Sequence, residues 1–216
     1  MSERVIRLSL DINILFADLL SARLGRSQSS ATMMVDAVRD GHCRAGPVQL
    51  IISVPVIENW ADVLRRHFHY DPEAANAKAW SLYDYALEGP LGTLPSLVVG
   101  AGHIPFATEQ DERRAITDHM RPENAGKLLD EISDDRHVLL AAVAGHADIL
   151  VTADMHDFTR RPTIRFRDRT DVVLFEYADR ALVVARPGFL AHWFDQGIVP
   201  DATFLAERRD DFVRPD

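Results

Sequence analysis

The sequence predicts an α/β fold with a parallel sheet, and three segments indicate it. The short apolar run at 5–10 is typical of a buried strand. The run at 48–54 is apolar almost throughout, as expected for a strand covered on both faces in a parallel sheet. A strongly apolar helix at 134–145 leads within a few residues into a third strand at 149–152. Such a helix-to-strand unit is an α/β crossover.

The other elements follow from apolar periodicity and from residues that start or stop helices. Gly25 and Gly41 are expected to end helices, whereas Pro55 and Pro187 stand near helix starts. The expected elements are, in chain order, a strand at 5–10, helices at 13–24 and from 27–30 to 41, a strand at 48–54, a helix at 56–69, a mainly helical region at 71–132, a helix at 134–145, strands at 149–152, 172–175 and 181–185, and a helix from Pro187.

Length and composition are those of an ordinary folded protein. The 216 residues suit one domain, 1–216, with the mainly helical region at about 71–132 as an insertion. Hydrophobic residues make up 47% and charged residues 26%, which excludes a disordered chain. The start lacks the apolar core of a signal peptide and no apolar run reaches the ~18 residues that span a bilayer, so we expect a cytoplasmic protein that does not bind membranes. The single cysteine, Cys43, excludes an internal disulfide and a cysteine-rich zinc site.

The net charge of −9 argues against a protein that coats nucleic acid through a basic surface. Clustered catalytic acids weaken that argument, because bound cations would balance their charge. The charge is also unevenly distributed, since 160–169 is the most basic segment and 109–135 is rich in acids.

Four acidic residues stand where strands end or helices begin. Asp11 ends the first strand, Glu58 follows the second, Asp135 opens the apolar helix, and Asp154 follows the third strand. Open α/β sheets bind ligands outside the carboxyl ends of their strands, so the four carboxylates are expected to meet there. Neighbouring carboxylates repel one another unless their pKa values rise or a cation binds. Mg²⁺ and Mn²⁺ prefer such oxygen ligands and activate water against phosphodiesters, which predicts a metal-dependent nuclease.

Several stretches resemble the PIN-domain nucleases, and most closely the VapC-like toxin ribonucleases of bacterial toxin–antitoxin pairs. The stretches that carry the resemblance are Leu10-Asp11-Ile12-Asn13-Ile14-Leu15, Ser53 through Glu58 with the following Val63-Leu64-Arg65, Leu150 through Phe158, and Val183 through Leu190. The chain departs from compact toxins in its longer segments at 71–132 and 160–177.

The resemblance implies a Rossmann-like three-layer α/β/α sandwich with a central, mostly parallel sheet. It also implies an endoribonuclease that cleaves RNA with Mg²⁺ or Mn²⁺, a possible antitoxin that would bring an arginine to the carboxylates, and a homodimer. Carried over residue by residue, the catalytic and metal-binding residues are Asp11, Glu58, Asp135 and Asp154. The supporting residues or alternative ligands are Asn13, Ser53, Asp134, Thr152 and Asp157.

Simpler structural interpretations stand beside these assignments. Asp11 could only cap the following helix, and Glu58 could be a solvated acid favoured by the helix dipole. Of Asp134 and Asp135, one is expected to cap the helix while the other coordinates metal. Asp157 could only hydrogen-bond nearby backbone.

The basic and aromatic residues are more ambiguous. Arg165 and Arg167 alternate with apolar residues, so both could bind phosphate from one strand face or protect a solvated edge strand. For Arg65 and Arg66 we favour stabilisation of the carboxyl end of their helix. The three tryptophans, Trp60, Trp80 and Trp193, are more typical of core positions than of base-stacking surfaces, and His67 and His69 lack the spacing for chelation within a helix.

Two other functions remain possible from the sequence. The chain could be a catalytically weak module that binds RNA or protein and keeps the acids as a structural cation site. It could also be a phosphohydrolase of the haloacid dehalogenase type, but those enzymes have a second aspartate where this chain has Asn13.

Overall fold

The architecture was derived from a computed structural model. It describes residues 4–26, 28–88, 136–156, 158, 164–166, 171–177, 180–207 and 212–213. The expected helices at 89–132 and the start of the helix at 134–145 lie outside these residues.

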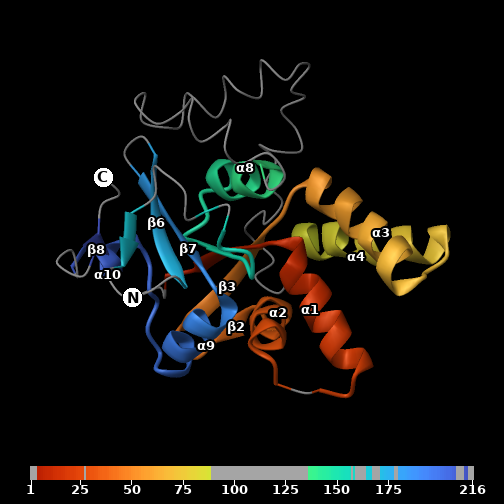
Figure 1. Cartoon of the computed structure of the whole chain (residues 1–216), viewed down its shortest axis with the longest axis horizontal. Helices are drawn as coiled ribbons and strands as arrows, with labels where there is room; N and C mark the ends of the chain where they lie inside the picture. Colours follow the sequence, from red (N-terminus) through yellow and green to blue (C-terminus); the bar gives the residue numbers. More distant parts are fainter. Residues whose placement is uncertain are drawn as a thin grey trace, which may run out of the picture.

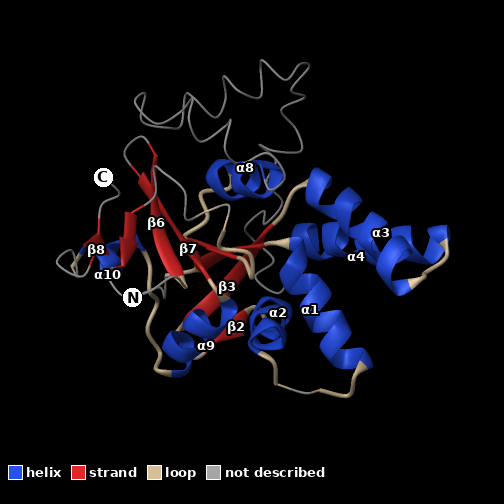
Figure 2. Cartoon of the chain, in the orientation of Figure 1, coloured by secondary structure: helices blue, strands red, loops and turns tan. Residues whose placement is uncertain are grey.

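Within the described residues, eight strands form one mixed sheet in the order β2-β3-β1-β4-β7-β6-β5-β8 (Figures 1 and 2). The strands are β1 (Ile6–Leu10), β2 (His42–Cys43), β3 (Gly46–Ile51), β4 (Ile149–Val151), β5 (Ile164–Phe166), β6 (Val172–Tyr177), β7 (Arg180–Ala185) and β8 (Phe212–Val213). The helices are α1 (Ile12–Arg23), α2 (Ser30–Asp40), α3 (Val54–Phe68), α4 (Pro72–Glu88), α8 (Arg136–Ala144), α9 (Pro187–Asp195) and α10 (Ala202–Ala206).

The centre of the sheet is parallel, as the sequence predicts. β1 pairs in parallel with β3 on one side and with β4 on the other, and β4 pairs in parallel with β7. Antiparallel strands extend this core at both edges, β2 beside β3 and β6, β5 and β8 beyond β7. The two-residue strands β2 and β8 were not expected, because so short a segment shows no apolar periodicity. The strands β6 and β7 were expected, and their short connection requires the antiparallel pairing that the structure shows.

Helices cover both faces of the sheet and complete three layers. α2 contacts α1, α9 and β3, whereas α8 contacts α3, β1 and β4. Figure 2 shows α8 on the opposite side of the sheet from α2 and α9. The α/β/α sandwich with a parallel core is therefore confirmed.

Local signals explain where the first helices begin and end. The Ser29 side chain accepts a hydrogen bond from the Thr32 backbone N–H at 3.1 Å and caps α2, and Gly41 ends α2 in the left-handed conformation with φ 66°. α3 begins at Val54, two residues earlier than expected, because Pro55 occupies its first turn. It ends at Phe68, since His69 adopts a left-handed conformation with φ 55°.

The core lies on both faces of the parallel strands. Every residue of β4 is buried, as are Leu8 on β1, Val48 on β3 and Val183 on β7. Trp60 is buried as predicted, but Trp80 is 39% exposed, so its expected place in the core is wrong. Trp80 lies on α4 and its ring contacts Tyr83 instead. No helix in the described parts of the chain combines the length and the apolar character that a membrane crossing needs.

Candidate active site

Asp11 follows β1 directly and lies at the carboxyl end of the parallel core. Its backbone N–H donates to the Val151 carbonyl at 2.9 Å, which extends the pairing of β1 with β4 by one residue. The residue is only 3% exposed. Asp11 stands at the N-cap of α1, yet its side chain makes no capping hydrogen bond. The backbone N–H groups of Ile12 and Asn13 nevertheless act on the carboxylate and lower its pKa against the larger opposite effect of burial, so a contribution of Asp11 to the start of α1 stands beside the metal-binding interpretation.

Thr152 binds the Asp11 carboxylate from the neighbouring strand. Its Oγ1 lies 2.6 Å from Asp11 Oδ2, 3.1 Å from Asn13 Nδ2 and 3.0 Å from the Asp154 backbone N. The last two groups are donors, so Thr152 Oγ1 accepts from both and its single proton goes to Asp11. One fully buried hydroxyl thus connects three of the residues expected at the site.

Asn13 holds α1 against the loop that follows β4. Its Nδ2 donates to Asp11 Oδ2 at 2.5 Å, and its Oδ1 accepts from the Ala153 backbone N–H at 3.0 Å. Both side-chain donors, from Asn13 and Thr152, therefore bind the same carboxylate oxygen, which fixes the rotation of the carboxylate.

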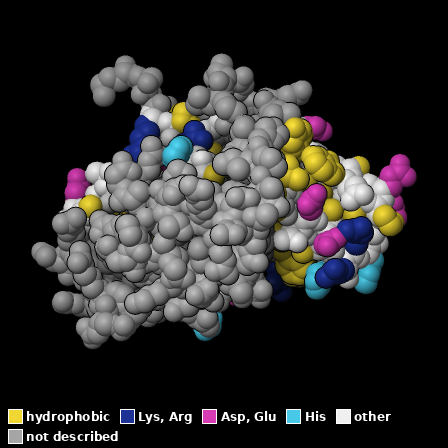
Figure 3. Space-filling model, turned by 90° about the horizontal axis from the view of Figure 1, so that it is seen from above, with side chains coloured by type: hydrophobic (Ala, Val, Ile, Leu, Met, Phe, Trp, Pro, Cys, Tyr) yellow, Lys and Arg dark blue, Asp and Glu magenta, His cyan; other side chains and the backbone are white. Residues whose placement is uncertain are grey.

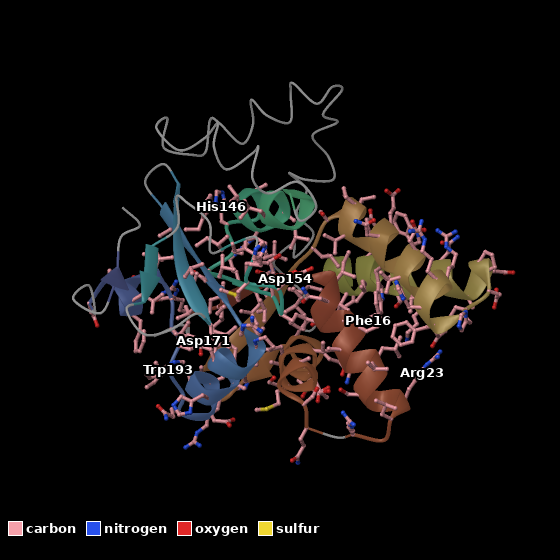
Figure 4. All side chains as sticks on the ribbon, in the orientation of Figure 1. Phe16, Arg23, His146, Asp154, Asp171 and Trp193 are labelled. Atoms are coloured by element: carbon pink, nitrogen blue, oxygen red, sulfur yellow. The ribbon has the colours of Figure 1, made fainter. Side chains whose placement is uncertain are left out.

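Asp154 lies at the exposed side of this cluster (Figure 4). Its Oδ1 accepts from the His156 backbone N–H at 3.0 Å, so a short turn holds the carboxylate beside the buried acid. Burial raises the pKa of Asp11 above its ordinary value, and the negative charge of Asp154 raises it further, while the hydrogen bond from Thr152 opposes the rise. A positive ion near the two carboxylates would relieve this cost.

A groove opens beside the two acids, between α1 and α3. We call it the α1–α3 groove, and its volume is about 420 Å³. Its lining residues are Asp11, Ile12, Asn13, Phe16, Asn59, Asp62, Val63, Arg66, His67 and Asp154. Asp11 directly precedes α1, and Phe16 lies in the second turn of that helix. Figure 4 shows the positions of Phe16 and Asp154.

Of the other expected site residues, the structure describes Glu58 and Ser53. Glu58 lies in the second turn of α3 with an exposed side chain and is not among the described residues that line the groove, which agrees with a solvated helix acid. Ser53 precedes α3, and its Oγ is fully buried without a hydrogen-bond partner in the described part of the chain. Four expected site residues lie outside the described part of the chain, namely Asp134, Asp135, Asp157 and Arg167. The side chain of Arg165 also lies outside it.

The backbone of Arg165 does belong to a strand, β5, as its alternating pattern predicts. That strand is not the last of the sheet, because β8 pairs with it on the side away from β6. The interpretation of this segment as an edge strand is therefore wrong.

From the sequence alone, none of the α3 residues that line the groove was expected at the site. Asn59, Asp62, Val63, Arg66 and His67 lie at intervals of three and four along α3, so they share one helix face. That spacing was a usable signal in the sequence, but the position of Phe16 opposite this face depends on the packing of α1 against α3.

The donor set suits a hard divalent cation. Carboxylate oxygens and the amide of Asn13 are the ligand types that Mg²⁺ and Mn²⁺ prefer. Within the described residues, no group of three or more His, Cys, Asp or Glu side chains is close enough to hold a metal ion. Of the four expected carboxylates, Asp11 and Asp154 line the α1–α3 groove.

These features define the class of protein, an α/β sandwich with an acidic site at the carboxyl edge of its parallel strands. A family model described as PIN domain matches residues 7–156, which is more than half of the chain. The chain belongs to the PIN domain family, a family of nuclease-type domains that commonly depend on divalent metals. Neither the search of curated proteins nor that of solved structures gives a match.

Proposed function

We propose that this protein is a metal-dependent endoribonuclease that hydrolyses RNA phosphodiester bonds with water. The observation that carries the proposal is the buried carboxylate of Asp11, held by Thr152 and Asn13 beside Asp154. A buried charge lowers the stability of a folded protein unless an opposite charge compensates it. The buried Asp11 carboxylate at the groove therefore supports a cation-binding site there.

Asp11, Glu58, Asp135 and Asp154 would hold Mg²⁺ or Mn²⁺. When bound, the metal lowers the pKa of a water molecule and neutralises the charge that develops on the phosphate. Thr152 and Asn13 keep the Asp11 carboxylate in one orientation. Three further residues would serve as supporting residues or alternative ligands, namely Asp134, Asp157 and Ser53. Asp134 precedes Asp135 in the sequence, and Asp157 lies three residues after Asp154. Ser53 has a buried hydroxyl group without a hydrogen-bond partner among the described residues.

RNA is the substrate class that the proposal favours, with Arg165 and Arg167 as candidate phosphate contacts. Their segment is the most basic in the chain, and cations contact the backbone of nucleic acids regardless of sequence. The β5 backbone places Arg165 in the extended conformation in which alternate side chains share a face.

The toxin role rests on the resemblance of the acidic motifs to toxin ribonucleases. In that role the protein would form a homodimer and would be silenced by an antitoxin whose arginine reaches the carboxylates. The outer carboxylate, Asp154, is exposed and could receive such a residue.

One observation favours a second function. Because Glu58 lies outside the lining of the α1–α3 groove, the chain could be a weak RNA- or protein-binding module with a structural cation site. In that case metal would raise the melting temperature without promoting cleavage.

The test is cleavage of a mixed pool of structured RNA by the purified chain with Mg²⁺, with Mn²⁺ and with a chelator. We expect cleavage with metal only, and we expect Asp11→Asn to abolish it. Asp36→Asn is the matched control, because Asp36 lies on the surface of α2 in an exposed ion pair with Arg39. Cleavage that survives the chelator or the Asp11→Asn change would refute the proposal, and thermal stabilisation by metal without cleavage would favour the second function.

A further inference from the structure

One arginine links the carboxyl ends of α1 and α3. Arg23 is the last residue of α1 and Phe68 is the last residue of α3. The Arg23 guanidinium donates from Nη2 to the Phe68 carbonyl oxygen at 3.1 Å. Its Cζ also lies 4.8 Å from the centre of the Phe68 ring and 5.4 Å from the centre of the Tyr70 ring. The same cation therefore contacts the end of α3 and the chain that follows it.

The three contacts of Arg23 suit an arginine better than a lysine. The last carbonyl groups of a helix have no partner within it and form the negative end of its dipole. α3 is followed by His69 in the left-handed conformation, and the Phe68 carbonyl takes its hydrogen bond from Arg23. A planar guanidinium can stack on rings and donate within its own plane, whereas an ammonium group presents a compact point charge.

Phe68 connects this contact to the α1–α3 groove. Phe68 is 4% exposed, and its ring packs on that of Phe16 with 5.0 Å between the centroids. The His67 ring meets Phe16 edge-on, at 5.7 Å and 89°. Phe16 and His67 line the groove, whereas Arg23 and Phe68 are not among its described lining residues. Arg23 therefore acts on the groove through Phe68.

The two walls of the groove are anchored in different ways. α1 begins directly after Asp11, and Asn13 in its first turn is bound to the Ala153 backbone N–H in the loop after β4. Asp154 belongs to the same loop. α3 packs against other helices, namely α1, α4 and α8. A shift of the carboxyl end of α3 would therefore change the width of the groove and leave the acidic cluster in place.

Arg23 lies at a part of the surface where charges are mixed. The side of the molecule formed by α3 and α4 carries basic, histidine, acidic and hydrophobic side chains in close mixture (Figure 3). Figure 4 shows Phe16 and Arg23 along α1. Exposed ion pairs weaken as salt is added. The contacts of Arg23 described above are made to a carbonyl group and two rings, so we expect them to persist at high salt.

We propose that Arg23 is a positioning residue of the candidate active site. It fixes the carboxyl end of α3 against α1 and thereby sets the width of the α1–α3 groove, while the sheet holds the acidic cluster independently. The effect of Arg23 on the reaction rests on the proposed function. Its effect on the distance between the helices does not.

The first test is the steady-state kinetics of RNA cleavage by the full chain. Arg23→Met keeps an apolar stem against the rings but removes the charge and the donors. We expect KM to rise about tenfold with kcat unchanged, the pattern of weakened substrate binding without loss of transition-state stabilisation. Partial unfolding would instead lower the apparent kcat and leave KM unchanged. Arg23→Lys keeps the charge and one donor, so its KM should lie between the two values.

The second test measures the distance between the helices without any reaction. After Cys43→Ser removes the single cysteine, spin labels are attached at Ala22 and Lys78. Both residues are exposed and outside the described groove lining, and Lys78 lies on α4, which packs on α3. We expect a narrow distance distribution at low and high salt that Arg23→Met broadens. Arg26→Met is the matched control, because Arg26 is an exposed arginine just beyond α1, and it should change neither measurement.

An unchanged distance distribution in Arg23→Met would overturn the proposal. A loss of kcat at constant KM would also overturn it, as would equal effects of Arg23→Met and Arg26→Met. If the wild type cleaves no RNA with either metal, the proposed function fails, and the distance measurement alone decides whether Arg23 fixes α3.

Discussion

The hydroxyl of Thr152 is the smallest group on which the acidic site depends. It donates to the Asp11 carboxylate and accepts from Asn13 and from the Asp154 backbone. We expect Thr152→Val to lower the free energy of unfolding by about 1–3 kcal/mol, because it leaves buried polar groups without partners. Thr152→Ser keeps the hydroxyl and should cost less. Urea denaturation compares the two, and equal stability would contradict the role of the hydroxyl.

Asp11 itself should destabilise the metal-free protein at neutral pH. Burial raises the pKa of Asp11 in the folded state above the unfolded value, so the folded protein favours the protonated carboxyl group. The free energy of unfolding should therefore fall as the pH rises through the folded pKa. Asp11→Asn removes this charge. In a chelator at pH 7.5 we expect the variant to melt a few degrees higher than the wild type, since about 1 kcal/mol corresponds to about 2–4 °C in a chain of this size.

The same variant should no longer be stabilised by Mg²⁺ or Mn²⁺. Calorimetry with and without metal measures both effects. A variant that melts lower than the wild type in chelator would show that the charge of Asp11 is compensated within the folded protein.

Among the elements, α4 is attached to the sandwich partly through one hydroxyl group. Tyr85 donates a hydrogen bond to the Val38 carbonyl near the carboxyl end of α2. Burial, together with the charge of Asp40, raises the pKa of Tyr85 to about 12. We expect Tyr85→Phe to lower the free energy of unfolding by about 1 kcal/mol at pH 7. Tyr83→Phe keeps the ring contact with Trp80 and should cost less.

The pH dependence supplies a second measurement on the same bond. The folded pKa of Tyr85 lies above the ordinary value of 10.0, so its stabilising contribution is complete below pH 10 and is lost as the pH rises toward 12. Between those values the wild type should lose stability more steeply than Tyr85→Phe. Parallel losses would contradict the assigned contact.

Element boundaries were predictable wherever a local signal exists. Gly41 ends α2 because glycine tolerates a positive φ, and Pro187 begins α9 because its missing N–H has no partner in a first turn. The antiparallel pairing of β6 with β7 was also predictable, because their connection is far too short for the crossover that parallel strands need.

In the candidate site, too, only residues with a local sequence signal were predictable. Asp11 and Asp154 were predictable neighbours, since both follow adjacent parallel strands. Arg66 and Phe16 were not, because their proximity depends on how α1 packs on α3. The sequence alone favoured a helix-stabilising role for Arg66 and gave no reason to separate it from Arg65.

At the scale of the whole molecule, Arg4 joins three distant segments. Its guanidinium binds Asp148, which directly precedes β4, with 2.6 Å between Arg4 Nη2 and Asp148 Oδ1. The same guanidinium contacts Asp201. Asp201 caps α10, because its Oδ1 accepts a hydrogen bond from the Phe204 backbone N–H. The Asp201 side chain is nearly buried.

We expect Arg4→Gln to lower the free energy of unfolding by about 1–2 kcal/mol, between the values for exposed and buried ion pairs. Arg39→Gln breaks an exposed pair with Asp36 and should cost less than about 0.5 kcal/mol. Chemical denaturation at low salt compares them. Similar losses from both variants would mean that the Arg4 contacts act as an ordinary surface pair.

The position of β1 in the middle of the sheet has a consequence for biosynthesis. β1 is made long before its neighbour β4, because 141 residues separate Asp11 from Thr152. A ribosome that translates this protein therefore releases the first acid long before the threonine that orients it. Contacts of such high sequence separation form late, so the Asp11 carboxylate has no fixed orientation until Thr152 has been made and β4 has paired with β1.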